Sequence, residues 1–279
     1  MKTIVVGADG SPGSENAMRW ASPIAAAHGA EVVVMTSLQP TDSELRPGRV
    51  DVLRAERQKL VDRWSKSAQL GNVVVRTVVK RGDPRQGILK VAEREAADLI
   101  VIGRIGTSAG PGLLHIGSMA EWLAHNTDRP IAIVGGAVNV STRSAIVGVD
   151  GSKGSEAALN WIAEHAAVSQ TRIVVASVEQ PFIEFTTSDS SKNWRRLTEK
   201  KIREEWAAPL TDAGIEFQAL ALRGSNAADN LLQAAKDERT DVVVVGLRGV
   251  GGFSGLRVGG VALKVLHRAD RPVVIVPAA

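Results

Sequence analysis

Residues 7–20 read GADGSPGSENAMRW and residues 148–161 read GVDGSKGSEAALNW, so one motif occurs twice in this chain of 279 residues. Nine of the 14 aligned positions are identical, and both stretches carry Asp-Gly-Ser directly after a short apolar run. An apolar run, a turn and a helical pattern in this order are typical of the first strand and helix of an α/β domain. The motif therefore predicts two copies of one α/β domain.

Later segments also repeat at matching places, which supports a duplication of the whole domain. They are DLIVIG at 98–103 and DVVVVG at 241–246, and RPIAIV at 129–134 and RPVVIV at 271–276. A short polar segment with Asn139, Ser141 and Thr142 separates the copies. We expect the first domain over residues 1–138 and the second over residues 143–279.

Each copy alternates apolar runs with helical patterns, which is typical of βαβ units and a mostly parallel sheet. The runs that we interpret as strands are 2–7, 31–37, 72–79, 98–103 and 130–135 in the first copy, and 145–150, 171–178, 215–222, 241–246 and 272–276 in the second. Ser11 before Pro12 is typical of a helix N-cap followed by a proline in the first turn. With right-handed crossovers, each copy becomes a flavodoxin-like (Rossmann-like) open sheet of five strands.

The composition excludes several classes of protein. Hydrophobic residues make up 44% and charged residues 23%, so we expect a packed core. There is no cysteine, which excludes disulfides and thiolate metal sites, and the five histidines show no metal-ligand spacing. No apolar run approaches the about 20 residues of a membrane helix, and the N-terminus has no signal-peptide pattern, so we expect a cytoplasmic protein without membrane contact.

The net charge of +4 is spread over the chain rather than gathered in one basic stretch. Residues 1–140 carry 17 basic and 14 acidic side chains, and residues 141–279 carry 17 and 16. Aromatic residues, on which nucleic-acid bases stack, make up 4% of the chain. We therefore interpret the charges as solvated helix faces and expect no nucleic-acid partner.

An acidic residue follows the first apolar run of each copy, at Asp9 and at Asp150. In open α/β sheets, ligands bind beyond the carboxyl ends of the strands, at the point where the strand order reverses. A carboxylate there binds a ribose hydroxyl or helps to hold a metal–phosphate group. Asp-Gly-Ser is equally typical of a turn or a helix cap, and the sequence leaves both interpretations open.

A glycine-rich segment follows the fourth strand of each copy. It runs from Gly103 and Gly106 to Gly117 and Ser118 in the first copy, and from Gly246 and Gly249 to Gly259 and Gly260 in the second. Residues without side chains let backbone N–H groups approach phosphate oxygens, and the positive end of the next helix dipole adds attraction. Arg104, Arg248 and Arg257 are candidates to add positive charge there.

A surface loop with a helix cap is the alternative interpretation of this segment. Ser118 with Glu121 three residues later matches a capping box, in which the serine only starts a helix. No Gly-Lys-Ser/Thr occurs, and no Gly-x-Gly-x-x-Gly follows a strand, so neither a Walker A loop nor a nicotinamide dinucleotide site is predicted.

Three features together resemble the universal stress protein family in its tandem two-domain form. They are Val-Gly-x-Asp-Gly-Ser at each first strand, the long glycine-rich segment, and the final strand that begins with Arg-Pro. The family pattern in the glycine-rich segment is Gly, two residues, Gly, nine residues, then Gly-Ser/Thr. The resemblance covers essentially the whole chain, and it implies two domains related by a pseudo-twofold axis, with strands 131–134 and 273–276 pairing between them.

The resemblance also implies an adenine nucleotide such as ATP, with or without Mg²⁺, in each domain. The implied nucleotide-binding residues are Ala8, Asp9, Ser37, Gly103, Gly106, Gly117, Ser118 and Met119 in the first domain, and Val149, Asp150, Ser177, Gly246, Arg248, Gly249, Gly259, Gly260 and Val261 in the second. In this arrangement Asp9 and Asp150 lie near the ribose, and the glycine-rich segments surround the phosphates. The ends of the second strands, at Ser37 and Ser177, lie beside the adenine.

Both copies depart from the family pattern. The first has ten residues between Gly106 and Gly117, including Pro111, and the second has Gly260 where the family has a hydroxyl. A lost hydroxyl removes a hydrogen bond worth about 0.5–1.5 kcal/mol, or up to ~3 kcal/mol when the partner is charged. We therefore expect nucleotide binding to be weakened rather than abolished, and to persist in at least one half.

On these grounds we expect a stress-response regulatory protein that binds ATP, rather than an enzyme with dedicated catalytic residues. We expect it to act through protein partners that the sequence does not identify, and to form a homodimer. A slow ATPase is the first alternative, with His115 in the first glycine-rich segment as a candidate acid or base. An interaction module with decayed nucleotide sites is the second, because the second copy lacks the hydroxyl at Gly260 and the first has one extra residue in its glycine-rich segment.

Overall fold

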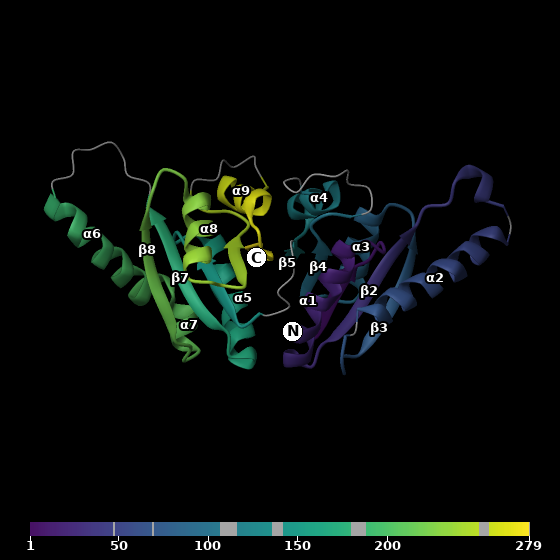
Figure 1. Ribbon diagram of the computed structural model, residues 1–279, viewed down its shortest axis with the longest axis horizontal. Coiled ribbons are helices and arrows are strands. Elements are labelled where there is room, and N and C mark those ends of the chain that lie inside the picture. The colour runs from purple at the N-terminus through teal and green to yellow at the C-terminus, as the bar shows by residue number, and fades with distance from the viewer. Residues whose placement is uncertain are drawn as a thin grey trace. The chain divides into compact units, whose positions relative to one another are not determined.

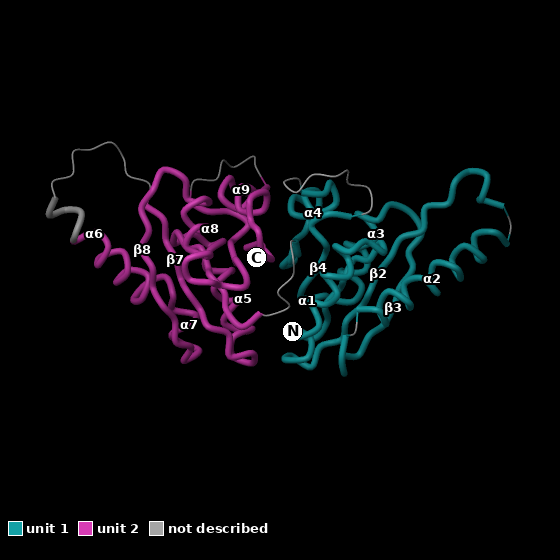
Figure 2. The backbone as a smooth tube through the Cα atoms, in the orientation of Figure 1, with its two compact units in different colours: residues 1–140 teal, residues 141–279 magenta. Residues whose placement is uncertain are grey.

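The computed structural model describes residues 1–46, 48–68, 70–106, 116–135, 142–179, 188–250 and 257–278, without the side chains of residues 188–192. The chain divides into two compact units, Met1–Val140 and Ser141–Ala279 (Figure 2). The predicted boundary at 138–143 falls mostly outside the described residues.

The first unit contains an open sheet of five parallel strands (Figure 1). The strands are β1 (Thr3–Gly7), β2 (Glu31–Leu38), β3 (Val75–Arg81), β4 (Leu99–Gly103) and β5 (Ile131–Val134), in the spatial order β3-β2-β1-β4-β5. The helices are α1 (Pro12–His28), α2 (Arg49–Ser67), α3 (Pro84–Arg94) and α4 (Ser118–Asn126), with a short 3₁₀ turn η1 (Asp42–Glu44). Because β1 lies between β2 and β4, the strand order reverses between β1 and β4.

The second unit repeats this arrangement, with the spatial order β10-β9-β6-β7-β8 and all neighbours parallel. Its strands are β6 (Ser144–Gly148), β7 (Arg172–Glu179), β8 (Phe217–Arg223), β9 (Val242–Gly246) and β10 (Val273–Val276). Its helices are α5 (Lys153–Ser169), α6 (Ser188–Lys201), α7 (Ala208–Asp212), α8 (Ala227–Asp237) and α9 (Gly260–Arg268), with a π-helical turn η2 (Ile202–Trp206) between α6 and α7. The predicted α/β fold, with five mostly parallel strands in each half, is confirmed.

The core of each unit is formed by strands that are buried on both faces. Ile4, Val5 and Val6 in β1 have no exposed surface, and Val243 and Val244 in β9 have none either. In the first unit α1 contacts α2, and α3 contacts α4, so the helices form two layers that enclose the sheet (Figure 1). Continuous runs of β-branched residues are therefore found where both faces of a strand are covered.

The first helix of each unit is fixed by a serine N-cap. The hydroxyl of Ser11 accepts a hydrogen bond from the backbone N–H of Ser14, and Ser152 accepts one from the N–H of Ser155. Pro12 occupies the first helical position of α1, where its missing N–H costs no hydrogen bond. The predicted N-cap at Ser11 is confirmed, and the helix begins directly beyond the carboxyl end of β1.

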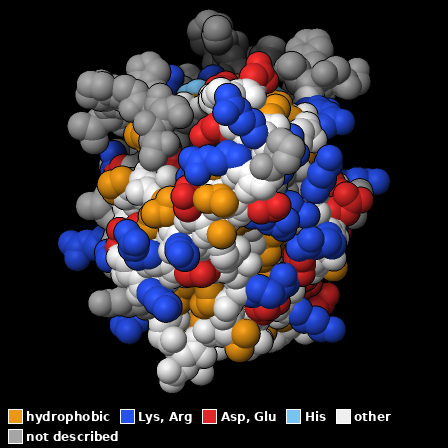
Figure 3. Space-filling view, turned by 90° about the vertical axis from the view of Figure 1, so that its right-hand side faces the viewer, with side chains coloured by type: hydrophobic (Ala, Val, Ile, Leu, Met, Phe, Trp, Pro, Cys, Tyr) orange, Lys and Arg blue, Asp and Glu red, His pale blue; other side chains and the backbone are white. Residues whose placement is uncertain are grey.

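Within the described residues, no helix combines the length and the apolar composition that a membrane span requires. On the side of the first unit that carries α2 and β3, Lys and Arg side chains are interspersed with Asp, Glu and apolar atoms (Figure 3). Arg76 on β3, for example, forms ion pairs with both Glu31 and Glu95. The charges on this face are therefore mixed.

Candidate functional site

The Asp-Gly-Ser motif forms a tight turn between the first strand and the first helix of each unit. Gly151 adopts a left-handed conformation with φ of 78°, and its counterpart Gly10 does so with φ of 82°. Asp150 Oδ1 accepts hydrogen bonds from the backbone N–H of Ser152 (3.0 Å) and from its hydroxyl (2.6 Å). The turn-forming interpretation of this motif is therefore confirmed in the second unit.

The same carboxylate also contacts the glycine-rich segment. Asp150 Oδ2 accepts a hydrogen bond of 2.8 Å from the backbone N–H of Val250. A Cβ atom on Gly249 would overlap Oδ2 of Asp150, and one on Gly106 would lie 2.6 Å from Oδ2 of Asp9. A larger residue at either position would displace the carboxylate, because the acid lies directly against the backbone of the segment.

A second close approach brings the first helix against the same segment. A Cβ atom on Gly154 in α5 would overlap the backbone oxygen of Arg248, and one on Gly246 would overlap the backbone of Gly154. In the first unit a Cβ atom on Gly13 would likewise overlap the backbone oxygen of Ile105. These glycines let the chain after the fourth strand lie directly on the start of the first helix, so the acid and the glycine-rich segment meet at one edge of the sheet.

The helices that follow the glycine-rich segments start at glycine in both units. Gly117 is the N-cap of α4 and Gly259 is the N-cap of α9, and neither provides a side-chain hydrogen bond to the first turn. The predicted capping box is therefore wrong, because Ser118 is the first helical residue and not the N-cap. Gly117 takes the N-cap position because its backbone N–H is held by the carbonyl oxygen of Arg104 at 2.8 Å, which keeps Gly117 in an extended conformation.

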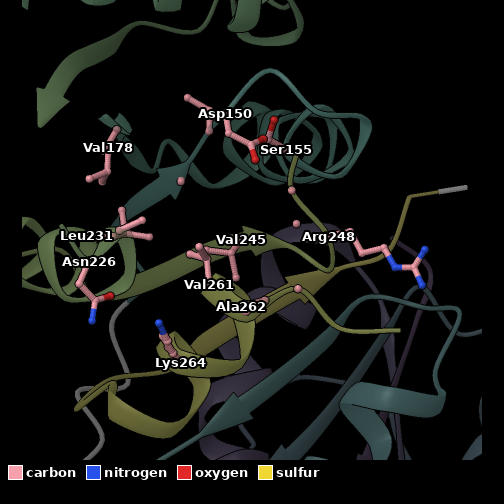
Figure 4. Close-up of a pocket in the computed structure, with 18 residues that line it drawn as sticks. Asp150, Ser155, Val178, Asn226, Leu231, Val245, Arg248, Val261, Ala262 and Lys264 are labelled. Carbon is pink, nitrogen blue, oxygen red and sulfur yellow. The ribbon is translucent and has the colours of Figure 1, made fainter. Parts of the chain in front are cut away.

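A cavity of about 290 Å³ lies in the second unit, where the strand order reverses between β6 and β9 (Figure 4). Its lining includes eight of the nine residues predicted for this half, namely Val149, Asp150, Gly246, Arg248, Gly249, Gly259, Gly260 and Val261. These residues come from the ends of β6 and β9 and from the start of α9. The tertiary structure therefore brings the two predicted motifs together around one cavity.

Ser177 is the ninth predicted residue, and it does not line the cavity, whereas the residues on either side of it do. Ala176 and Val178 are part of the lining, whereas Ser177 is buried with 6% of its surface exposed. Successive side chains of a strand point to opposite faces of the sheet, so Ser177 faces away from the side that carries the cavity.

The sheet register also shows which residue of the first unit corresponds to Val178, the lining residue of β7. The carbonyl oxygen of Met35 accepts a hydrogen bond from Ala8 N–H, and that of Ala176 accepts one from Val149 N–H. These matching bonds align Ser37 with Val178, not with Ser177. The two predicted serines are therefore not equivalent, because the register places them on opposite faces of their strands.

Several lining residues were not predicted from the sequence. Asn226 and Leu231 come from α8, Ser155 from α5 and Lys264 from α9. The sequence signal for Asn226 is its position directly before a helical pattern, and it is indeed the N-cap of α8. Its role at the cavity could not be read from this signal, because it depends on how α8 packs beside β6.

Two basic side chains belong to the cavity lining, and they differ in direction. Lys264 extends toward the labelled lining residues, whereas the guanidinium of Arg248 points away from them (Figure 4). Arg248 Nε donates a hydrogen bond of 3.2 Å to the backbone oxygen of Arg257. Arg248 thus ties the two described ends of the glycine-rich segment together.

In the first unit the predicted residues occupy corresponding backbone positions. Ala8 and Asp9 follow β1, Gly103 ends β4, and Gly106 lies beside Asp9. Ser118 and Met119 begin α4, and Ser118 is exposed. Residues 107–115, which include Pro111 and His115, lie outside the described residues, as do residues 251–256 of the second unit.

Arg104 does not correspond to Arg248. Arg104 N–H donates to Val134 O, as Leu247 N–H donates to Val276 O, so Arg104 matches Leu247 and Ile105 matches Arg248. Arg104 is 7% exposed and packs against Gly135, where a Cβ atom would lie 2.5 Å from its Cδ. Arg104 and Arg248, both candidates for added positive charge, therefore differ by one position in the register.

Comparison with known proteins identifies the family. The model of the universal stress protein family matches residues 1–135 and again residues 142–277. A universal stress protein of Mycolicibacterium smegmatis is 25% identical over 291 residues, which cover 98% of this chain and 96% of that protein. The crystal structure of a universal stress protein from Archaeoglobus fulgidus matches with a TM-score of 0.75 and 18% identity, covering 99% of this chain and 98% of that one.

A universal stress protein solved in complex with cAMP is 29% identical and matches 48% of this chain and 96% of its own, with a TM-score of 0.36. The family model covers nearly the whole of the present chain in two consecutive copies, and the fold of each unit agrees with it. The protein therefore belongs to the universal stress protein family and contains two of its domains.

Proposed function

We propose that this chain is a regulatory protein of the stress response that binds an adenine nucleotide such as ATP in the cavity of its second unit. The observation that carries the proposal is the cavity itself. An apolar wall, a carboxylate and the start of a helix without a side-chain cap meet there within about 290 Å³. Ligand pockets in proteins range from about 300 Å³ upward and combine apolar walls with a few convergent polar groups.

The apolar wall suits the adenine base. Val178, Leu231 and Val245 line the cavity, and Leu231 and Val245 are only 2% and 4% exposed. These side chains are held in place by the sheet and by α8, so the wall is formed before a ligand arrives. Burying a planar base against it removes apolar surface from water, which is favourable by roughly 25 cal/mol per Å².

Asp150 suits the ribose. A carboxylate has about four acceptor sites, and three hydrogen bonds from Ser152 and Val250 already use three of them. One acceptor site remains for a ribose hydroxyl.

The start of α9 suits the phosphates. Gly259 provides no side-chain cap, so the backbone N–H groups of Gly260 and Val261 are open to a ligand. The positive end of the helix dipole lies at the same point. Within the described part of the chain, no three acidic or histidine side chains come together as a metal centre would need, so we expect Mg²⁺ to arrive with the nucleotide and to be held mainly by its phosphates.

The test is a thermal melt of the full chain with and without millimolar ATP–Mg²⁺, in the wild type and in Gly249→Ala and Gly106→Ala. A ligand at one hundred times its Kd stabilises the folded state by about 2.7 kcal/mol, which raises the melting temperature of the unit that binds it. We expect this rise in the wild type and in Gly106→Ala. We expect it to be reduced in Gly249→Ala, because the new methyl group displaces the carboxylate of Asp150.

A rise that is lost only in Gly106→Ala would contradict the assignment to the second unit. The absence of any rise with ATP, ADP or AMP in the wild type would overturn nucleotide binding and favour an interaction module. Each variant is also melted without nucleotide, so that a loss of stability is separated from a loss of binding.

A further inference from the structure

Two of the differences between the starts of α4 and α9 concern a hydroxyl and a cation. The first helical residue is Ser118 in α4 and Gly260 in α9, and the residue four positions later is Trp122 in α4 and Lys264 in α9. The two helices are equivalent, since Gly117 N–H donates to Arg104 O and Gly259 N–H donates to Leu247 O, both at 2.8 Å. One unit thus has a hydroxyl without a following cation, and the other has a cation without the hydroxyl.

The geometry of a helix places the two positions together. Residues four apart lie on the same face, and side chains lean toward the N-terminus of the helix. The side chain of Lys264 therefore reaches back toward Gly260, and Figure 4 shows it directed at the cavity. A Cβ atom on Gly260 would have no neighbouring atom within 4 Å, so the space beside it is open.

Lys264 is available to bind a ligand. Among the residues that the structure describes, no hydrogen bond or ion pair is formed by its ammonium group. The amide of Asn226, by contrast, is used at the N-cap of α8, where it accepts from Asp229 N–H and donates to the Asp229 carboxylate. Arg248 is engaged with the backbone of Arg257.

The first unit carries less positive charge at the positions that correspond to Asn226, Arg248 and Lys264. Asp83 is the N-cap of α3 where Asn226 is the N-cap of α8, and Ile105 stands where Arg248 does. With Trp122 in place of Lys264, each of these three positions is more positive by one unit charge in the second unit than in the first. Of the two added cations, Lys264 is directed at the cavity, whereas Arg248 points away from it.

We propose that Lys264 binds the phosphate chain in place of the hydroxyl that Gly260 lacks, so that the second unit selects adenine ligands by their phosphate charge. This inference rests on the proposed function of the cavity and names the residue that sets its specificity. The ammonium group supplies a charge-assisted hydrogen bond to a phosphate oxygen. Lys264 thereby explains how a domain without the family's serine or threonine keeps a phosphate-binding site.

The test is calorimetric titration of adenosine, AMP, ADP and ATP into the full chain and into Lys264→Gln, Gly260→Ser and the double variant. We expect Lys264→Gln to weaken ATP binding by about tenfold, as the loss of a hydrogen bond to a charged group does, and to leave adenosine binding unchanged. We expect Gly260→Ser to restore most of the loss in the double variant and to add little to the wild type. Such non-additivity is what two groups that serve one ligand site produce.

The matched control is Lys236→Gln. Lys236 lies in the last turn of α8, outside the cavity lining, and forms an ion pair with Asp270. The Lys236→Gln substitution removes the same charge from the same unit, so it measures the general electrostatic effect on ATP binding. Lys264 is exposed, and melting curves without ligand check that its variants fold as the wild type does.

Equal weakening of adenosine and ATP by Lys264→Gln would overturn the inference, and so would ATP binding that Lys264→Gln leaves unchanged. The inference would also be overturned if Lys236→Gln weakened ATP binding as much as Lys264→Gln does. If none of the four ligands binds, the proposed function fails and this inference fails with it. If ATP binds and the ratio of ATP to adenosine affinity is unchanged, only this inference fails.

Discussion

The Asp-Gly-Ser turns of the two units are built alike, whereas the residues around the starts of α4 and α9 differ. In both turns the glycine is left-handed, and a tryptophan, Trp64 or Trp206, lies against it. A side chain on Gly10 or Gly151 would be strained by its φ and would overlap the indole. The geometry of the turn therefore disfavours any residue with a side chain at Gly10 or Gly151.

Several of the positions that differ between the starts of α4 and α9 are exposed. Ser118, Gly260 and Lys264 are all exposed, and no packing fixes their identity. The comparison teaches that the two units share the close backbone approaches of the scaffold, whereas exposed side chains at the starts of α4 and α9 differ between them. Three sets of substitutions test this division, beginning with the largest expected effect.

Gly154→Ala tests whether the close approach of helix and glycine-rich segment is required in the second unit. The new Cβ would overlap the backbone oxygen of Arg248, which cannot move as a flexible side chain would. We expect a loss of about 3 kcal/mol, at the upper end of overpacking effects, and a fall in melting temperature of the order of 10 °C. Thermal unfolding followed by circular dichroism measures it.

Gly13→Ala should act in the same way in the first unit, since its Cβ would overlap Ile105 O. Gly260→Ala is the opposite control, because its Cβ meets no atom within 4 Å. If Gly154→Ala melted at or above the wild-type temperature, the close approach would not be a constraint on the scaffold.

Asp150→Asn and Asp9→Asn form a matched pair for the two sites. An amide NH₂ in place of Asp150 Oδ2 cannot accept the hydrogen bond from Val250 N–H, so the glycine-rich segment loses this contact. We expect ATP binding to weaken by about tenfold, or about 1.4 kcal/mol, in Asp150→Asn. Calorimetric titration of ATP gives the affinities.

Asp9→Asn should leave the same titration within about twofold of the wild type, a change of roughly 0.4 kcal/mol. A large loss in Asp9→Asn with no loss in Asp150→Asn would reverse the comparison and assign the nucleotide to the first unit.

Arg76→Gln tests a smaller difference between the two sheets. In the first unit Arg76 binds Glu31 and Glu95, whereas the second unit has Gln218 in its place, bonded to Glu238. The substitution leaves two neighbouring carboxylates without their shared partner. Because Arg76 is partly exposed, we expect a loss of only about 0.5–1 kcal/mol near pH 7.

The effect of Arg76→Gln should depend on pH. Hydrogen bonds from Arg76, and then from Arg94, hold the pKa of Glu95 below its ordinary value. Stability from a lowered carboxyl pKa is fully present above the ordinary pKa, near 4.3, and is lost as the pH falls through the lowered value. The melting difference between wild type and variant should therefore shrink from pH 7 toward pH 3. A difference that stays constant over this range would exclude the ion pair as its cause.

Much of the fold was predictable because its signals are local. The apolar run before Asp9 and the Ser11-Pro12 cap are read from neighbouring residues, and the repeat at 148–161 confirms the pattern within the same chain. The helix start at Gly117 was not predictable, because it is set by a hydrogen bond to Arg104, thirteen residues away. A capping box is a local pattern, and here a tertiary contact overrides it.

The sequence by itself determined that the chain holds two α/β domains, that their acids and glycine-rich segments lie at the ends of the strands, and that the second domain lacks a hydroxyl at Gly260. The first two features follow from hydrophobic periodicity and from the few residues that tight turns accept, and the third follows from the resemblance to the family pattern. The tertiary structure alone decided that Val178 rather than Ser177 faces the cavity, that Arg104 is buried, and that Lys264 points into the site. Each of these depends on strand register and helix packing between residues far apart in the chain, which no local pattern encodes.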